Sequence, residues 1–327
     1  MNENAVKKIA ILTSGGDCPG MNPCIRAAVR TAAAKGLEIY GVKDGLQGLI
    51  DDRFVKLEST FASGLSSLGG TVLGTARSME FMTPEGRAKA AENVRKRGIE
   101  ALVIMGGDGS FRGGSALCQE QGIHFAGLPC TIDNDMYGTD YTIGFHTALN
   151  TIVEAVDKVR DTARSHHRLF FVETMGRHSG ALAVAAAVAT GADAVLIPET
   201  KTDLPALAEK IKKSFARAHK SFIVIVAEGD EAGNAITIEK KVRELSGVEG
   251  RVCVLGHIQR GGSPCAFDRI LASVLGFRAV EALCEGKKNI FLGVQEEKVS
   301  ITPIEEIIGK KKPFKENFLE VADVLCT

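Results

Sequence analysis

The stretch KIAILTSGGDCPGMN, residues 8–22, passes from a short apolar run through a glycine-rich turn into a segment of helical period. An apolar run bounded by turn residues is typical of a buried strand, and a helix directly after it completes a βα unit. The same order recurs at residues 101–121, where ALVIM precedes GGDGSFRGG and a second helical segment. Repeated βα units predict an α/β fold with mainly parallel sheets.

The rest of the chain continues this alternation of strands and helices. Apolar runs predict strands at residues 8–12, 37–42, 101–105, 123–128, 168–173, 194–198, 221–228 and 251–256. Segments of helical period lie at residues 22–35, 84–97, 110–121, 146–163, 178–190, 203–218, 234–246 and 265–285. So many strands favour two sheets, and no low-complexity linker separates them. We therefore expect two domains between which the chain crosses.

The charges of the 327-residue chain balance, with 40 Lys and Arg residues against 40 Asp and Glu residues. This balance removes the global electrostatic argument for binding nucleic acid or an anionic membrane, so we expect neither as a partner. The longest apolar run, residues 181–198, is interrupted by Thr190, Gly191 and Asp193, which predicts that nothing spans a membrane. The eight cysteines form no CxxC pair, which favours free thiols and a cytoplasmic location.

Two glycine-rich turns directly follow strand candidates, at residues 13–22 and 106–114. Ligands of open parallel sheets bind beyond the carboxyl ends of the strands, where glycine lets backbone amides approach a phosphate and the next helix adds partial positive charge. Asp108 adds a carboxylate that could bind a metal. Tight βα turns also need glycine for structural reasons alone, and that alternative stays open for either loop by itself. Neither loop has the P-loop or the NAD-binding spacing.

The stretch GLPCTIDNDMYGTD, residues 127–140, follows another strand candidate and places Asp133 and Asp135 at the same edge. Aspartates in such loops often serve only as turn or helix caps. Three later loops place further polar groups at strand ends: Arg177, Glu228, His257 and Arg260. Cations at successive strand ends suit a sugar phosphate, and carboxylates between two phosphate sites suit phosphoryl transfer.

Seven motifs, in order, closely resemble those of the bacterial ATP-dependent 6-phosphofructokinases: LTSGGDCPGMN, GTAR, GGDGS, TIDND, GTDYTIGF, MGRHSG and LGHIQRGGSP. The similarity covers almost the whole chain, down to KKPFKENFL at residues 311–319. It implies two similar three-layer α/β/α domains. The larger, nucleotide-binding domain would comprise residues 1–142 and 257–307, and the smaller, sugar-phosphate-binding domain residues 143–256 and 308–327. The implied reaction is the glycolytic transfer of the γ-phosphoryl of MgATP to the 1-hydroxyl of fructose 6-phosphate.

The resemblance also implies roles for individual residues. Asp133 would take the proton of the 1-hydroxyl, and the further catalytic residues would be Thr131, Arg77 and Arg177. Asp108 and Asp135 would place Mg²⁺, whereas Asp140 is expected to be structural. The nucleotide-binding positions are Gly15, Arg77, Ser78, Gly107, Asp108, Gly109 and Ser110. The sugar-phosphate positions are Thr131, Ile132, Asp133, Arg168, Met175, Gly176, Arg177, Glu228, Arg251, His257, Ile258, Gln259 and Arg260.

Two of these arginines, Arg168 and Arg251, match residues that the family supplies from a neighbouring subunit, which implies a homotetramer with shared active sites. The phosphoryl donor depends on two other positions. Cys130 stands where ATP enzymes of the family usually have glycine and pyrophosphate enzymes have lysine, and Gly109 stands where pyrophosphate enzymes usually have aspartate. A carboxylate there would crowd and repel a nucleotide phosphate, so Gly109 favours ATP.

An effector site for ADP or phosphoenolpyruvate is also implied by the resemblance. Its matching positions are Arg26, Arg30, Arg160, Gly191, Asp193 and Arg217, with Asp193 in place of the usual glutamate. Three positions depart from the family pattern, since Ser59 replaces an arginine, Gly64 an aspartate and His219 a lysine. We therefore expect the familiar effectors to bind weakly or not at all. The alternative for the two arginines of the first helix is a solvated pair four residues apart.

Other functions fit parts of the pattern. A pyrophosphate-dependent phosphofructokinase would differ only in the phosphoryl donor. A NAD or lipid kinase would share the GGDG loop but not MGRHSG or HIQRGGSP. A non-catalytic nucleotide-sensing subunit would usually lose the carboxylates that this chain keeps at positions 108, 133 and 135. An oxidoreductase would need the dinucleotide-binding fingerprint that both glycine loops lack.

Overall fold

Seven strands form a mixed sheet in the computed structural model, which describes residues 6–217, 221–314 and 316–325. Their order across the sheet is β11-β10-β5-β4-β1-β2-β3. Their bounds are β1 Lys8–Thr13, β2 Glu38–Val42, β3 Phe54–Lys56, β4 Ala101–Gly106, β5 His124–Pro129, β10 Ile290–Gln295 and β11 Lys298–Pro303. The five central strands are parallel, and the antiparallel strands β3 and β11 close the two edges.

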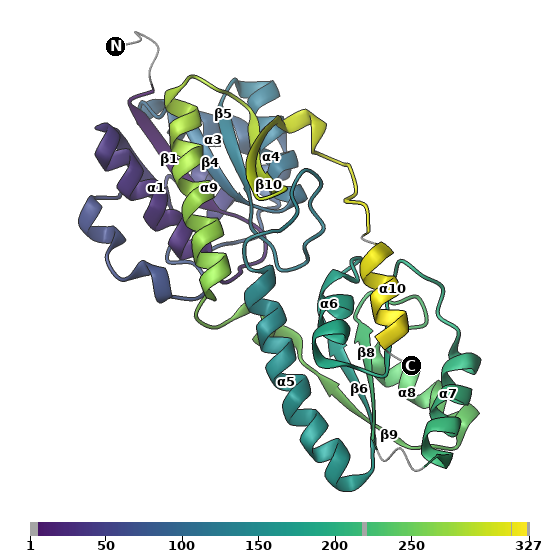
Figure 1. Cartoon of the computed structure of the whole chain (residues 1–327). Coiled ribbons are helices and arrows are strands. Elements are labelled where there is room, and N and C mark those ends of the chain that lie inside the picture. The colour runs from purple at the N-terminus through teal and green to yellow at the C-terminus, as the bar shows by residue number, and fades with distance from the viewer. Residues whose placement is uncertain (1–5, 218–220, 315, 326–327) are drawn as a thin grey trace. The chain divides into compact units, whose positions relative to one another are not determined.

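Helices cover both faces of this sheet (Figure 1). They are α1 Met21–Lys35, α2 Gly45–Ile50, α3 Pro84–Lys96, α4 Asp108–Gln121 and α9 Ala266–Cys284, with the short 3₁₀ helices η1 Ser59–Ala62, η2 Leu65–Ser67, η3 Glu80–Met82 and η5 Ile304–Glu306. Ala10 and Leu12 of β1 pack in one cluster with Ala90 of α3 and Phe111 of α4. Helices α1 and α9 pack together over the other face (Figure 1). This double cover explains why β1 is apolar without alternation, because both of its faces are buried.

A second sheet has four strands, all parallel, in the order β7-β8-β6-β9. Their bounds are β6 Leu169–Thr174, β7 Ala194–Leu196, β8 Phe222–Ala227 and β9 Gly250–Val254. The surrounding helices are α5 Phe145–His166, α6 Ala181–Thr190, α7 Leu204–Ala216, α8 Ala235–Ser246 and α10 Glu316–Leu325, and the 3₁₀ helix η4 Gly256–Arg260 follows β9. Helices α7 and α8 pack against β6 and β8 through Leu207, Ile211 and Ile238. Helix α6 packs on β7 and β8 outside that cluster.

The chain divides into two compact units. One comprises Met1–Thr131, Met136–Thr147 and Arg260–Lys312, and the other comprises Ile132–Asp135, Ala148–Gln259 and Pro313–Thr327. The expected domain ranges, 1–142 plus 257–307 and 143–256 plus 308–327, differ from these units chiefly at residues 132–135, which group with the second unit. The other breaks fall within five residues of the expected positions, after residues 147, 259 and 312.

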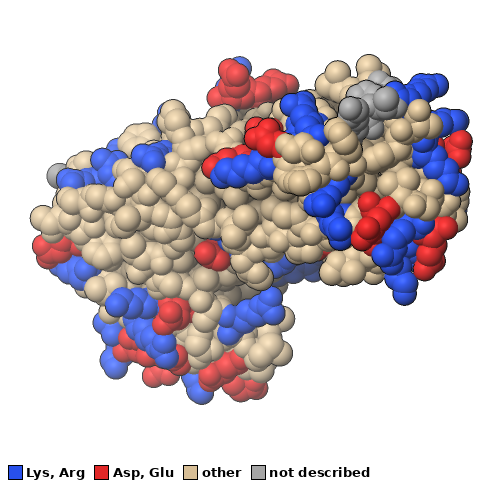
Figure 2. Space-filling view, turned by 90° about the horizontal axis from the view of Figure 1, so that it is seen from below, with Lys and Arg blue, Asp and Glu red and all other residues tan. Residues whose placement is uncertain are grey.

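The sequence-based fold class is confirmed, since each predicted strand overlaps an observed one and two α/β sheets are present. Strands β3, β10 and β11 and helices α2 and α10 were not predicted. On the face of the molecule in Figure 2, basic and acidic side chains lie interspersed. Within the described part of the chain, no helix is both long and apolar enough to cross a membrane.

Candidate active site

The two glycine-rich loops lie side by side in the first unit. The hydroxyl of Ser110, in the first turn of α4, donates to the hydroxyl of Ser14 at 2.9 Å, and both groups are buried. A Cβ built on Gly106 would lie 2.5 Å from the hydroxyl oxygen of Ser110, so glycine is needed where the loops meet. The chain segment after η2 contacts the first of these loops, because the hydroxyl of Thr75 donates to the carbonyl of Gly15 at 2.8 Å.

The N-terminus of α4 leaves open space for a ligand. A Cβ built on Gly107 or Gly109 would meet nothing within 4 Å. The carboxylate of Asp108 lies beside this space and accepts hydrogen bonds from Nε of Arg112 at 2.6 Å and from the backbone N–H of Gly309 at 3.1 Å. Free backbone amides and the helix dipole make this end of α4 an anion-binding position. The expected nucleotide positions Gly15, Gly107, Gly109 and Ser110 therefore come together.

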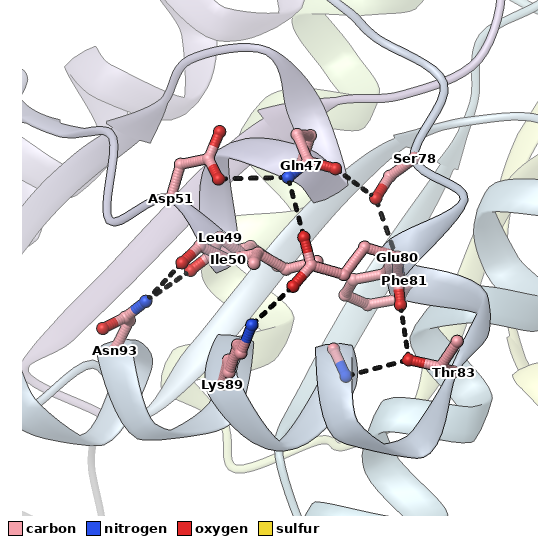
Figure 3. A network of polar contacts seen from close by, with 11 residues as sticks. Gln47, Leu49, Ile50, Asp51, Ser78, Glu80, Phe81, Thr83, Lys89 and Asn93 are labelled. Carbon is pink, nitrogen blue, oxygen red and sulfur yellow. Dashed lines mark hydrogen bonds and ion pairs between the residues drawn. The ribbon is translucent and has the colours of Figure 1, made fainter.

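Arg77 and Ser78 follow Thr75, which contacts the first glycine loop. Arg77 is exposed. The hydroxyl of Ser78 donates to Oε1 of Gln47 at 2.6 Å and accepts a hydrogen bond from the backbone N–H of Phe81 at 3.0 Å (Figure 3). Because a hydroxyl has one proton, Ser78 has none left for a phosphate, and a nucleotide contact at this residue would use its backbone.

Asp133 is 4% exposed and belongs to the second unit. Its Oδ2 lies 3.7 Å from Nε of Arg177, which follows the carboxyl end of β6. Arg177 has a left-handed backbone, with φ of 53°, which is uncommon for a residue with a side chain. Oε1 of Glu228 holds this turn by accepting hydrogen bonds from the N–H groups of Gly176 at 3.3 Å and Arg177 at 2.8 Å. A strained turn fixed in this way is typical of functional sites.

The loop after β9 contributes to both units. In the second unit, Oε1 of the buried Gln259 accepts a hydrogen bond from the N–H of Met175 at 3.1 Å, which ties η4 to the Arg177 turn. Ile258, also on η4, is 58% exposed. In the first unit, Nη1 of Arg260 donates to the carbonyl of Asp17 at 3.1 Å, in the first glycine loop. Met175, Glu228 and Gln259 thus support Arg177, whereas Arg260 reaches the nucleotide side.

Two expected sugar-phosphate residues lie at the amino ends of strands in the second sheet, whereas Arg177 lies at the carboxyl end of β6. Arg168 directly precedes β6, and Arg251 pairs with Phe170 at the amino end of that strand. Met175 and Arg177 follow the carboxyl end of β6, and a strand of six residues is about 20 Å long. Within one chain, Arg168 and Arg251 are therefore not brought together with Arg177.

A metal site built by protein groups alone is not found among the described residues, since no three or more His, Cys, Asp or Glu side chains cluster there. The two expected ligands are Asp108 in the first unit and the exposed Asp135 in the second. Mg²⁺ is commonly held by one or two carboxylates together with substrate phosphates and water. Each of these carboxylates is a ligand of the type that Mg²⁺ prefers.

The expected effector residues fall into two groups. In the first unit, Nη1 of Arg30 donates to the hydroxyl of Ser59 at 2.9 Å, and Arg26 lies one turn earlier on α1. In the second unit, Nη2 of Arg160 donates to the carbonyls of Thr190 at 2.7 Å and Gly191 at 2.9 Å. Near these groups, Asp193 accepts a hydrogen bond from the N–H of Ile223, and Arg217 ends α7. His219 lies outside the described residues.

Sequence reasoning missed Gln47, which contacts Ser78 from α2. The signal for it was present, because Gln47 follows a predicted strand at residues 37–42 and lies in the glycine-containing stretch DGLQGL. Loops after strands are where ligand sites form, but this loop is short of charged residues that would suggest phosphate binding.

Comparisons with known proteins agree with this geometry. Residues 8–283 match the family model described as Phosphofructokinase. The chain is 50% identical to ATP-dependent 6-phosphofructokinase 1 of Thermus thermophilus over 98% of this chain and 100% of that protein. It is 52% identical to ATP-dependent 6-phosphofructokinase of Staphylococcus carnosus, covering 94% of this chain and 95% of that protein.

Solved structures show the same fold. Phosphofructokinase of Saccharomyces cerevisiae superposes with a TM-score of 0.87 and 38% identity over 98% of this chain, which spans 46% of the yeast chain. A pyrophosphate-dependent phosphofructokinase of Marinobacter aquaeolei has a TM-score of 0.85 at 20% identity, covering 98% of this chain and 92% of that one, which is a likeness of fold alone. Taken with the matched family model and the curated relatives, these likenesses mean that the chain belongs to the phosphofructokinase family.

Proposed function

We propose that this chain is an ATP-dependent 6-phosphofructokinase, which transfers the γ-phosphoryl of ATP to the 1-hydroxyl of fructose 6-phosphate and yields fructose 1,6-bisphosphate and ADP. The observation that carries the proposal is the buried Asp133 beside Arg177 at a sheet edge held by Glu228. Curated relatives about half identical over nearly the whole chain carry that name, which supports the same reaction here.

Asp133 accepts the proton of the attacking hydroxyl in the proposed reaction. Burial of its carboxylate excludes competing water, and the guanidinium of Arg177 lies 3.7 Å from it as an oppositely charged partner. Arg177 is 57% exposed at its side chain, so it remains able to contact a phosphate or the transferring group. Thr131 directly precedes this segment and is held by Thr142, whose hydroxyl donates to its carbonyl at 2.6 Å.

The phosphates of the donor bind at the N-terminus of α4, next to the first glycine loop. Backbone amides at Gly107 and Gly109 and the helix dipole neutralise part of their charge, and Arg77 adds a cation. Mg²⁺, held by Asp108 and Asp135, would supply further neutralisation of the phosphate oxygens.

ATP is favoured over pyrophosphate by the space around Gly109. That residue has no neighbour within 4 Å of a built Cβ, so the α-phosphate of a nucleotide has room there. An aspartate at this position would bring a carboxylate close to that phosphate and repel it. A pyrophosphate-dependent reaction is the second candidate, because Cys130 is not the glycine usual in ATP enzymes.

The active enzyme is proposed to be a homotetramer with shared active sites. The support is the position of Arg168 and Arg251 at the amino edge of the second sheet, too far from Arg177 to act with it in one chain. Helix α9 also presents an exposed apolar stripe that a second copy could cover. Its residues, at helical spacing, are Phe267 (44% exposed), Ile270 (66%), Val274 (39%) and Phe277 (40%).

An effector site for ADP or phosphoenolpyruvate is a further proposal, and it is expected to be weak. Ser59 occupies one cation position, so one positive charge is missing there, and its hydroxyl takes one N–H of Arg30 that an anion could otherwise use.

The test is the formation of fructose 1,6-bisphosphate from fructose 6-phosphate and Mg²⁺ by purified protein, with ATP and pyrophosphate in parallel reactions. Turnover with ATP alone is the expected result. Turnover mainly with pyrophosphate would overturn the choice of donor but keep the family. No turnover with either donor would favour a nucleotide-sensing subunit.

A further inference from the structure

The segment that carries Arg77 is anchored on both sides of that residue. On the N-terminal side, the hydroxyl of Thr13 donates to the carbonyl of Gly74 at 2.7 Å, and the hydroxyl of Thr75 donates to the carbonyl of Gly15 at 2.8 Å. On the C-terminal side, the anchor is the hydroxyl of Ser78. Because the Arg77 side chain is exposed, the direction in which it leaves the backbone depends on these neighbours.

Ser78 is held by Gln47, whose amide has a fixed orientation (Figure 3). Nε2 of Gln47 donates to Oδ1 of Asp51 at 3.0 Å and to Oε2 of Glu80 at 3.5 Å. Carboxylates only accept hydrogen bonds, so the NH₂ group must face them and the amide oxygen must face Ser78. The hydroxyl proton of Ser78 therefore points to Gln47, and its lone pair accepts the N–H of Phe81 at 3.0 Å.

The two carboxylates that accept hydrogen bonds from Gln47, those of Asp51 and Glu80, are themselves held by ion pairs. Nζ of Lys89, on α3, lies 2.7 Å from Oε1 of Glu80. Asp51 pairs with Nη2 of Arg53 at 2.8 Å. These ion pairs hold both carboxylates in place near Gln47, which keeps its amide in one orientation.

We propose that Gln47 is a positioning residue for phosphoryl transfer, which holds Arg77 at the phosphate-binding edge through the hydroxyl of Ser78. Gln47 touches no substrate in this role. It prevents the backbone at residues 76–78 from turning, so that the guanidinium of Arg77 meets the donor phosphates without a search over other orientations. The role rests on the proposed function, since Arg77 matters only if phosphates bind beside it.

The test compares Gln47→Met, which keeps the length of the side chain without its amide, with Ser78→Ala and with the double variant. Each single variant is expected to lower kcat/KM for ATP by roughly five- to tenfold, with KM for fructose 6-phosphate within about twofold of the unmodified protein. The losses in the double variant should be less than additive, because both single variants remove the contact between Gln47 and Ser78.

The matched control is Asn93→Ala. Nδ2 of Asn93, on α3, donates to the carbonyls of Leu49 and Ile50 at 2.9 Å each, so this change loosens α2 without touching Ser78 (Figure 3). It should lower the melting temperature and leave kcat/KM for ATP within about twofold. An equal loss in Asn93→Ala, or no loss in Gln47→Met, would overturn the positioning role while the enzyme still turns over. Absence of any turnover in the unmodified protein would instead overturn the proposed function.

Discussion

Arg260 and Gly16 are fitted to each other. A Cβ built on Gly16 would lie 2.5 Å from Nη1 of Arg260, so the arginine passes through the space that any larger residue would fill. The same nitrogen donates to the carbonyl of Asp17. The first glycine loop therefore sets the place of a cation that lies 243 positions further along the chain.

Replacing Gly16 by alanine should separate stability from function. Gly16 has no positive φ, and the atoms that a methyl group would displace are the flexible end of a side chain. We expect the melting temperature to change by less than about 2 °C. Displacement of Arg260 should raise KM for fructose 6-phosphate roughly tenfold. Calorimetry and steady-state kinetics check the two effects, and an unchanged KM would mean that Arg260 does not bind this substrate.

At Gly229, unlike Gly16, a larger residue should lower stability as well as activity. A Cβ there would collide with the backbone carbonyl of Arg177, which cannot move as a side chain can. Gly229→Ala should therefore destabilise the second unit by about 1–3 kcal/mol and also lower kcat. Chemical denaturation measures the first effect. A variant with native stability and full activity would show that the Arg177 turn tolerates a shift.

Loss of the Asp133 carboxylate should stop the chemical step without preventing binding. We expect Asp133→Ser to lower kcat by about 10²–10⁴-fold, the range of a general base, with little change in the affinity for fructose 6-phosphate. Asp140→Asn is the control, because Oδ2 of Asp140 accepts a hydrogen bond from the N–H of Glu296 in a structural contact. Comparable turnover in Asp133→Ser and unmodified protein would remove Asp133 from its role as base.

Shared active sites predict complementation between two inactive variants. Asp133→Ser and Arg168→Ala should each be nearly inactive alone, because every site lacks one residue. After mixing under conditions that exchange subunits, some sites would take Asp133 from one chain and Arg168 from another, and activity should return. Mixtures that stay inactive despite proven exchange would place both residues in the same chain's site.

The Cys130 thiol should be inert in the folded protein. Burial raises the pKa of Cys130 well above its usual value, and the neighbouring thiol of Cys18 raises it further. The thiol, 1% exposed, therefore remains protonated at pH 8 and does not react as a thiolate. Peptide mapping after iodoacetamide treatment should find Cys130 unmodified until denaturant is added. Rapid labelling with loss of activity would contradict this expectation.

Much of the fold and of the site follows from local sequence. The burial of β1 on both faces leaves an uninterrupted apolar run, and Arg177 can be assigned to a carboxyl edge because it follows such a run. Arg168 precedes the same apolar run, so the sequence also indicates that Arg168 and Arg177 lie at opposite ends of one strand. Strand β11 could not be predicted from the sequence. It lies at an edge of the sheet, most of its residues are partly exposed, and it has no apolar run.

The contacts that sequence could not provide join residues far apart in the chain. Gln47 and Ser78 are 31 positions apart, and nothing in either local pattern indicates that one hydroxyl proton is shared between them. Arg260 and Asp17 are 243 positions apart. Composition and periodicity indicate which face of a helix or strand a residue lies on. The pairing of polar atoms depends instead on how elements distant in the chain pack together.

The position of β10 in the first sheet governs the order in which the chain can fold during synthesis. This strand lies between β5 and β11, so the edge of β5 stays open until the ribosome has made Ile290–Gln295. The four strands of the second sheet all lie between residues 169 and 254 and are complete earlier. The sheet that contains the first strand is thus the last to close, and in the meantime a nascent chain exposes an edge that can pair with another copy.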